Sequence, residues 1–388
     1  MSAPRKSLAA AMALCVLLGL LLSGCANYRE TEDLIFIDAI AVDRAPNGKF
    51  LVTAETTNAS GGMEAEIIPR YLECEGDTIV DAMRNMQKFS INELYWSHTE
   101  VLIMSQQVAT EDLAEVIDTM MRVRQIRQSL ALIVSKEPTA KEVLESENPT
   151  KQPNGPNIMN ALRAQRLLGK APYTQMFELV DTVAGQGEES VVALIGLSEV
   201  NGKKEIEVSG AAVIHSHWLV GFIDENDTRI FLLAAGRVKK TEFPLPADPG
   251  GKFSDSTVSL DTDRVSVTVG FENGKPWCEF GIVGNVILES IDGASPDPDQ
   301  FQQVTDAILI NTSMALENSL VALIQKTKGI GSSDILGIGS HLQDSQPELW
   351  KQINGQWNEL YNQLDVRVWT DLKLRSTNQI AQPVAERE

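Results

Sequence analysis

Histidine is the side chain most suited to acid–base or metal chemistry near neutral pH, and this chain has four. His215 and His217 lie two residues apart on an expected strand, where their side chains would share a face and could bind one metal ion. A surface hairpin before Trp218 explains the pair as well, and no third ligand follows at a recognisable spacing. We interpret His98 and His341 as polar groups at the edge of a core, and we predict no metal site and no cofactor.

Two charged clusters could bind ions, and each has a simpler interpretation. The acidic residues Asp292, Asp297 and Asp299 could collect a hard cation, but they lack the spacing of a calcium loop. We interpret them as a solvated loop, since acidic residues suit the N-terminus of the helix that follows. Three arginines at the end of an expected helix could bind an anion: Arg122, Arg124 and Arg127. Cations at a helix end interact favourably with the helix dipole, so their position requires no such role.

The sequence contains none of the short motifs that assemble common catalytic sites. It has no glycine-rich phosphate loop, no Gly-x-Ser-x-Gly, no His-Glu-x-x-His and no Cys-x-x-Cys. We therefore predict that the protein is not an enzyme. A surface hydrolase is the alternative if the fold unites His98, His215 or His341 with a carboxylate and a serine.

Cys25 is the residue with the clearest predicted covalent chemistry. It ends the sequence Leu22-Ser23-Gly24-Cys25, which follows an apolar run over residues 8–22 led by two basic residues. That order is typical of a secretory signal, and the run is shorter than the roughly 20 residues that span a bilayer. The ending resembles the bacterial lipobox, in which the cysteine becomes the lipidated first residue. We predict a cleaved signal over 1–24 and N-palmitoyl, S-diacylglycerol modification of Cys25; a retained anchor or ordinary cleavage is the alternative.

The bulk composition limits the partners of this chain. Its 388 residues are 43% hydrophobic and 22% charged, which is typical of a globular protein with sizeable cores. A net charge of −20 argues against nucleic acid and against a body lying flat on anionic lipid. Cys15 would leave with the signal and Cys25 would carry lipid, so only Cys74 and Cys278 remain. We expect two buried thiols in separate domains, with a single bridge as the alternative.

The first half of the chain shows the elements of an α/β fold. Runs at 34–42 and 50–57 predict a hairpin, and 67–72, interrupted by Pro69, predicts a strand at a sheet edge. Asp77 is the expected cap of one helix and Thr110 of a second, each followed by apolar residues at helical spacing. Strands are predicted at 101–104 and 130–134, a loop at 148–156, helices at 158–168 and 174–183, and a strand at 191–197.

The second half is richer in strands. They are predicted at 205–214, 218–223, 258–260, 265–271 and 281–288. A long helix is predicted from Phe301 to Leu323, a glycine-rich turn at 329–339 and a helix from Pro347. Residues 366–374 alternate apolar and polar, which predicts a strand with one buried face.

These elements predict a multidomain α+β or α/β fold of mixed sheets flanked by helices. We divide the chain into a signal peptide (1–24), a lipidated tether (25–33), an N-terminal α/β region (34–203), a C-terminal α+β domain (204–376) and a polar tail (377–388).

The chain also carries a series of segments in a characteristic order. They are the lipobox and tether, 30–43, 76–103, the helix end at 122–127, Gly210-Ala211-Ala212-Val213, Asp334-Ile335-Leu336-Gly337-Ile338-Gly339, and the closing helix and strand from Pro347. In this order they resemble the spore germination Ger(x)C family, the lipoprotein C subunits of nutrient germinant receptors. One departure is Ala26-Asn27-Tyr28-Arg29, where many relatives carry an aromatic-acidic pair after the cysteine.

The resemblance implies a non-enzymatic lipoprotein that acts beside A-type and B-type integral-membrane subunits. It implies a place at the outer face of the spore inner membrane and a role in germination in response to nutrients. The alternative is a solute-binding lipoprotein of a transporter, which would favour two parallel-sheet lobes around a cleft.

Overall fold

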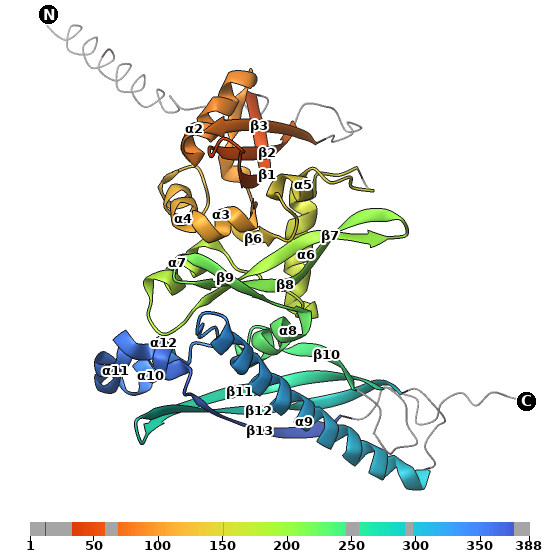
Figure 1. The fold of residues 1–388 in the computed structure, drawn as a ribbon. Helices are drawn as coiled ribbons and strands as arrows, with labels where there is room; N and C mark the ends of the chain where they lie inside the picture. Colours follow the sequence, from red (N-terminus) through yellow and green to blue (C-terminus); the bar gives the residue numbers. More distant parts are fainter. Residues whose placement is uncertain are drawn as a thin grey trace, which may run out of the picture.

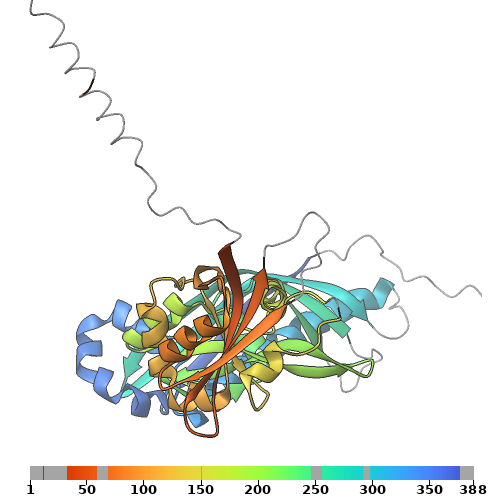
Figure 2. The same ribbon diagram turned by 90° about the horizontal axis from the view of Figure 1, so that it is seen from above.

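The computed structural model describes residues 33–58, 69–149, 151–245, 256–291 and 298–375, and Met12 alone before them. The described strands form two sheets that lie one above the other along an elongated molecule (Figure 1). Seen from above, the layers overlap, so the molecule is a column (Figure 2). The predicted class of mixed sheets flanked by helices is therefore confirmed, while the signal peptide, residues 25–32 of the tether and the tail lie outside the described residues.

Nine of the described strands form the upper sheet. They are β1 (Leu34–Arg44), β2 (Phe50–Asn58), β3 (Arg70–Gly76), β4 (Glu93–Tyr95), β5 (Val101–Met104), β6 (Ala131–Ser135), β7 (Ser190–Val200), β8 (Lys203–His215) and β9 (Trp218–Ile223). The order is β3-β2-β1-β5-β6-β7-β8-β9, with β4 against the start of β1. The four central strands are parallel, as helix–strand alternation predicts, and the predicted hairpin is β1 with β2.

Helices cover both faces of the upper sheet. One face packs on α2 (Ile79–Met86), α3 (Gln106–Glu111), α4 (Leu113–Arg122) and α7 (Met176–Ala184). We call this layer the upper core, and Ile40, Leu102 and Leu194 are among its buried residues. The other face packs on α5 (Ala140–Leu144) and α6 (Asn154–Leu168).

Three predictions about helix ends are wrong. The cap of α2 is Thr78, whose side chain accepts from the Asp81 amide, and not Asp77. Thr110 lies inside α3, where its hydroxyl donates to the Gln106 carbonyl; the chain breaks at Asp112 before α4 begins. The loop predicted over 148–156 ends early, because α6 begins at Asn154.

The lower sheet has the order β10-β11-β12-β13. Its strands are β10 (Lys240–Leu245), β11 (Ser256–Glu272), β12 (Lys275–Ile291) and β13 (Asp365–Leu374). The runs predicted at 258–260 and 265–271 belong to one strand, β11, and β10 was not predicted. The predicted alternation of β13 is confirmed, because every second residue from Asp365 to Lys373 is exposed.

Two helices fill the space between the sheets. They are α8 (Glu225–Ala234), which was not predicted, and the long helix α9 (Pro298–Gly329), which crosses the lower sheet (Figure 1). With the undersides of β7, β8 and β9 they form the lower core, in which Phe231, Phe280 and Leu320 are buried. Within the described residues, 306–329 of α9 are long and apolar enough to span a membrane, but their buried residues belong to this core.

A group of short helices lies between α9 and β13, beside the lower sheet. They are α10 (Ile338–Ser345), α11 (Pro347–Ile353) and α12 (Trp357–Tyr361). Single turns of 3₁₀ helix lie at Gln87–Phe89, Trp96–His98 and Asn354–Gln356. The expected boundary at 203–204 falls at the start of β8, directly after the turn from β7, and these two strands pair along their length in the upper sheet. The division of the chain at that point into two folding units stays a prediction.

Candidate functional site: a polar pocket beside the C-terminal helices

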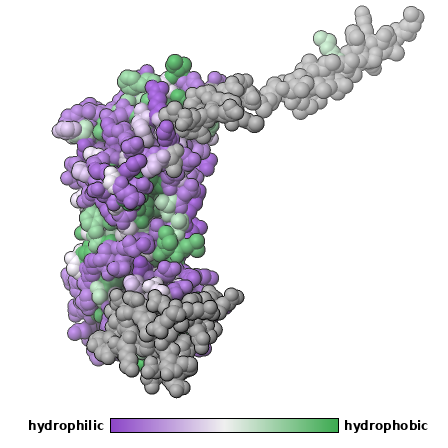
Figure 3. Space-filling model, turned by 90° about the vertical axis from the view of Figure 1, so that its right-hand side faces the viewer, coloured by the Kyte–Doolittle hydropathy of each residue, from purple (hydrophilic) through white to green (hydrophobic). Residues whose placement is uncertain are grey.

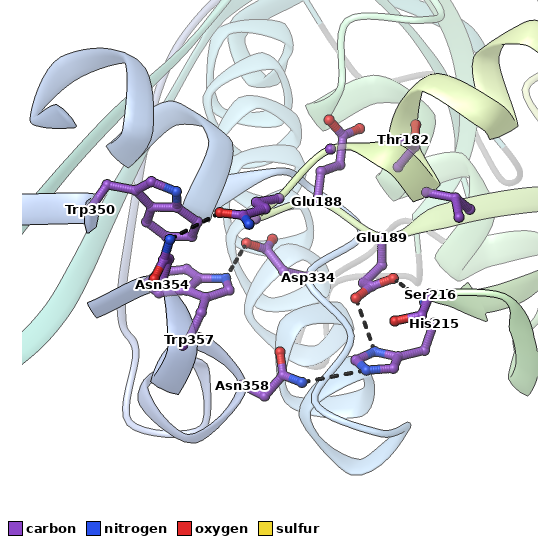
Figure 4. A pocket seen from close by; sticks show the side chains of 15 residues that line it. Thr182, Glu188, Glu189, His215, Ser216, Asp334, Trp350, Asn354, Trp357 and Asn358 are labelled. Atoms are coloured by element: carbon purple, nitrogen blue, oxygen red, sulfur yellow. Dashed lines mark hydrogen bonds and ion pairs between the residues drawn. The ribbon is translucent and has the colours of Figure 1, made fainter. Parts of the chain in front are cut away.

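A cavity of about 260 Å³ lies where three distant parts of the chain meet (Figure 4). They are the turn between α7 and β7, the turn between β8 and β9, and the segment from Asp334 through α12. The lining is mostly polar: the acidic residues are Glu188, Glu189 and Asp334, and two indole rings form part of the wall.

Asp334 organises one side of this pocket. Its carboxylate accepts hydrogen bonds from the Ile338 amide at 3.0 Å, the Gly339 amide at 2.7 Å and the Trp357 indole N–H at 3.1 Å. Burial raises the pKa of Asp334 to about 7, although these three donors act in the opposite direction. The carboxylate thus joins the first turn of α10 to α12.

Two glycines allow the pocket walls to approach each other. The Ser340 amide donates to the Gly187 carbonyl, and the Glu189 amide donates to the Asp334 carbonyl, both at 2.9 Å. A Cβ on Gly339 would lie 2.7 Å from the Gly187 Cα and 2.8 Å from the Trp350 ring. Gly187 also has a φ of 81°, which favours glycine. Glycine at both positions is required by this contact.

His215 and Glu189 lie next to each other in the pocket. His215 Nδ1 lies 3.1 Å from Glu189 Oε1, at an angle outside hydrogen-bond geometry, and the Ser216 amide donates to the same carboxylate at 2.8 Å. Burial raises the pKa of Glu189, while the Ser216 amide and His215 lower it. His215 Nε2 lies 3.4 Å from Asn358 Nδ2, as Figure 4 shows.

The pocket meets part of the condition that we set for a hydrolase, since it unites a histidine, carboxylates and Ser216. Nucleophilic catalysis also needs a hydrogen bond from the hydroxyl to the histidine base. Among the described residues, no hydrogen bond joins the Ser216 hydroxyl to His215, and Nε2 faces Asn358 instead. The acidic and polar lining could bind a small polar or cationic group.

The other predicted histidines have structural surroundings. The His98 side chain is 48% exposed; its Nδ1 lies 3.0 Å from the buried carboxylate of Asp38, and its ring packs against that of Phe36. His341 is exposed on α10, which differs from the core-edge position that we expected. His217 lies in the turn after β8 with its ring 3.8 Å from that of Trp218, so the hairpin interpretation is correct. No cluster of metal ligands is found among the described residues.

The remaining predicted residues are placed as follows. Arg122 ends α4 and pairs with Asp118 at 2.7 Å, as a helix-end charge. Cys74 and Cys278 are free, buried and in different cores, which confirms the expectation of two buried thiols. Cys25, Asp292 and Asp297 lie outside the described residues, and Asp299 falls in the first turn of α9.

Family models match almost all of the described chain. Residues 27–197 match the spore germination protein N-terminal domain, and residues 209–378 match the spore germination B3/GerAC-like C-terminal domain. The chain therefore belongs to the Ger(x)C family of spore germination proteins.

Individual relatives are distant but match over nearly their full length. The chain is 21% identical to spore germination protein B3 of Bacillus subtilis (strain 168), covering 92% of this chain and 94% of the relative. It is 22% identical to spore germination protein KC of the same organism, over 98% of each chain. It is 21% identical to spore germination protein GerQC of Bacillus cereus, over 93% of this chain and 97% of the relative.

A solved structure supports the fold. The crystal structure of the GerBC protein matches with a TM-score of 0.53 and 15% identity, covering 87% of this chain and 97% of that one. At this identity the likeness establishes the arrangement of strands and helices, and the surface chemistry of each protein has to be read from its own residues.

Proposed function

We propose that the chain is the membrane-anchored C subunit of a spore nutrient germinant receptor. The observation that supports this is the pair of family matches over 27–197 and 209–378, together with relatives that are named as spore germination proteins. In this proposal the protein is required for germination in response to nutrients.

The proposed mechanism depends on Cys25. Lipid on this residue holds the folded body at the outer face of the spore inner membrane, because two or three acyl chains bind a bilayer firmly where one does not. Anchoring raises the effective concentration of the body near A-type and B-type integral-membrane subunits. In this proposal the body acts as a non-catalytic scaffold or signalling subunit.

The transporter alternative is less well supported by the fold. A solute-binding lipoprotein was expected to have two parallel-sheet lobes around a cleft. In the lower sheet, β10, β11 and β12 are antiparallel neighbours, and only β13 runs parallel to β12. The described part of the chain thus has parallel pairing mainly in the upper sheet.

The test is germination of spores that carry Cys25→Ala, followed as loss of optical density after nutrients are added. We expect failure with nutrients and normal germination with a receptor-independent trigger. Cys15→Ala is the matched control, because Cys15 would leave with the signal peptide, and it should germinate normally. Normal nutrient germination of Cys25→Ala spores would refute an essential lipid anchor.

A further inference from the structure

A groove of about 740 Å³ lies at the end of the molecule where the described chain begins. Its walls are α2, residues 93–96 and the turn after α4. Leu34, the first residue of β1, pairs with Glu93 on this wall, so the chain from Cys25 arrives beside the groove. Figure 1 places α2 and β1 at the end of the column opposite the lower sheet.

The groove is basic in a chain that is strongly acidic. Arg84, Arg122 and Arg124 line it and are exposed, and Lys88 is exposed close by in sequence. Arg122 pairs with Asp118, but no ion pair to Arg84 or Arg124 occurs within the described residues. One acidic residue, Glu93, also lines the groove, so the lining has a net positive charge in a chain of net charge −20, and its arginines could bind anions.

The segment between the groove residues Gln87 and Glu93 carries two exposed apolar side chains. Phe89 is 66% exposed and Ile91 is 103% exposed, on the segment between α2 and β4. Figure 3 shows apolar atoms in green at this end of the column. Removing apolar surface from water is favourable by roughly 25 cal/mol per Å². Burial of these two side chains in an apolar partner would therefore stabilise the complex.

The segment that displays these side chains is held in place. The Gln87 side chain donates to the carbonyls of Ser90 at 3.3 Å and Asn92 at 2.9 Å. It also accepts from the Leu94 amide at 3.2 Å. The exposure of Phe89 and Ile91 is therefore a property of an ordered turn.

We propose that this end of the molecule docks on an anionic phospholipid surface, with Phe89 and Ile91 inserted at the interface and the arginines on lipid phosphates. The proposal rests on the proposed function, because lipid on Cys25 brings the surface within reach. The eight residues between Cys25 and Leu34 span at most about 30 Å when extended. An anionic bilayer would repel the acidic body if its long side lay on the surface. The long axis of the molecule therefore stands away from the bilayer, with the groove end in contact with the lipid.

The experiment uses residues 25–388 with Cys25→Ser, which contain every strand and every labelled helix of the described fold but carry no lipid. We would measure co-sedimentation with vesicles of phosphatidylcholine alone and of equal parts phosphatidylcholine and phosphatidylglycerol. We expect binding to the anionic vesicles and much weaker binding to the neutral ones. Binding should fall as salt is raised, because the Debye length shortens to about 3 Å at 1 M.

Paired variants identify the docking surface. Arg84→Gln with Arg124→Gln should weaken partitioning about tenfold or more, since each basic residue near the surface contributes to binding. Phe89→Ser with Ile91→Ser should weaken partitioning to the anionic vesicles but leave its salt dependence unchanged. The matched controls are Lys203→Gln with Lys204→Gln, and Leu167→Ser with Leu168→Ser. These residues are also exposed but lie elsewhere, so the control variants should bind like the parent chain.

Two outcomes would overturn the proposal. One is no binding to anionic vesicles, or equal binding by all four double variants. The other is unchanged vesicle binding combined with loss of nutrient germination in the arginine variant, which would assign the groove to an acidic protein segment. Because the vesicle assay uses a chain without lipid, its failure would leave the Cys25→Ala germination test unaffected.

Discussion

At the scale of single residues, two buried carboxylates connect parts of the chain that are far apart in sequence. Glu55 on β2 accepts from the amides of Asn154 at 2.6 Å and Gly155 at 2.5 Å, the first residues of α6. Asp334 accepts from the first turn of α10 in the same way. Burial raises the pKa of each carboxyl to about 7. Each therefore fixes where a helix begins, at the expense of burying an ionisable group.

Glu55→Gln is expected to destabilise the protein by about 1–3 kcal/mol. The two oxygens of Glu55 each accept from one backbone N–H, and in glutamine one of them is replaced by an –NH₂ group, which leaves one buried N–H without an acceptor. Urea unfolding measures the loss. Glu199→Gln, on an exposed position of β7, is the matched control and should change stability little. Equal losses in the two variants would show that Glu55 does not determine the start of α6.

Asp334 predicts a pH dependence of stability with a definite sign. Its pKa is raised from 3.8 to about 7 in the folded state, so the native chain binds more protons than the unfolded chain between these values. The stabilisation is present below about pH 4 and is lost as the pH rises through about 7. We expect the unfolding free energy of the wild type to fall relative to that of Asp334→Asn between about pH 4 and pH 7. A constant difference between the two proteins would contradict the raised pKa.

At the scale of elements, local patterns predicted several elements that have one buried face. The alternation at 366–374 and the hairpin of β1 and β2 are examples. The helix α8 was missed because it lies between the two sheets. Every residue from Thr228 to Ala234 is buried, so no apolar stripe with a polar opposite face marks it as a helix. The strand β10 contains Pro244, which hides its pattern.

The candidate pocket could be predicted only in part. His215 and the segment Asp334 to Gly339 were singled out from the sequence, but their meeting with residues 186–189 depends on contacts across more than one element. The glycine-rich stretch at 329–339 predicted a turn. In the structure its last residues begin α10, because Asp334 binds the amides of Ile338 and Gly339. No local pattern reports that Gly187 touches Gly339.

Gly339→Ala tests this close contact between elements. The added methyl would overlap Gly187 and the Trp350 and Trp357 rings, so we expect a loss of about 1–3 kcal/mol as α10 moves away from the α7–β7 turn. Gly355→Ala is the matched control, since a Cβ there has no heavy atom within 4 Å. Thermal melts of both variants give the comparison. If Gly339→Ala has the same melting temperature as Gly355→Ala, the close packing of Gly339 on Gly187 does not contribute to stability.

At the scale of the whole molecule, the strands β7, β8 and β9 carry residues of both cores, and β8 shows this most clearly. Ala212 and Ile214 of β8 lie in the upper core, while Ala211 and Val213 lie in the lower core. Because successive side chains of a strand point to opposite faces, loss of either core would expose half of β8. The upper and lower parts should therefore unfold together, although their sheets are separate.

The two buried thiols report on this coupling, since Cys74 lies in the upper core and Cys278 in the lower one. Burial raises the pKa of the Cys278 thiol to about 12, so little thiolate is available for labelling in the native state. In the Cys25→Ser chain of residues 25–388, Cys74→Ala and Cys278→Ala each leave one thiol. We expect both to react with Ellman's reagent at the same urea concentration. Separate midpoints would mean that the two ends unfold independently, as the predicted division at residues 203–204 implies, and that β8 does not couple them.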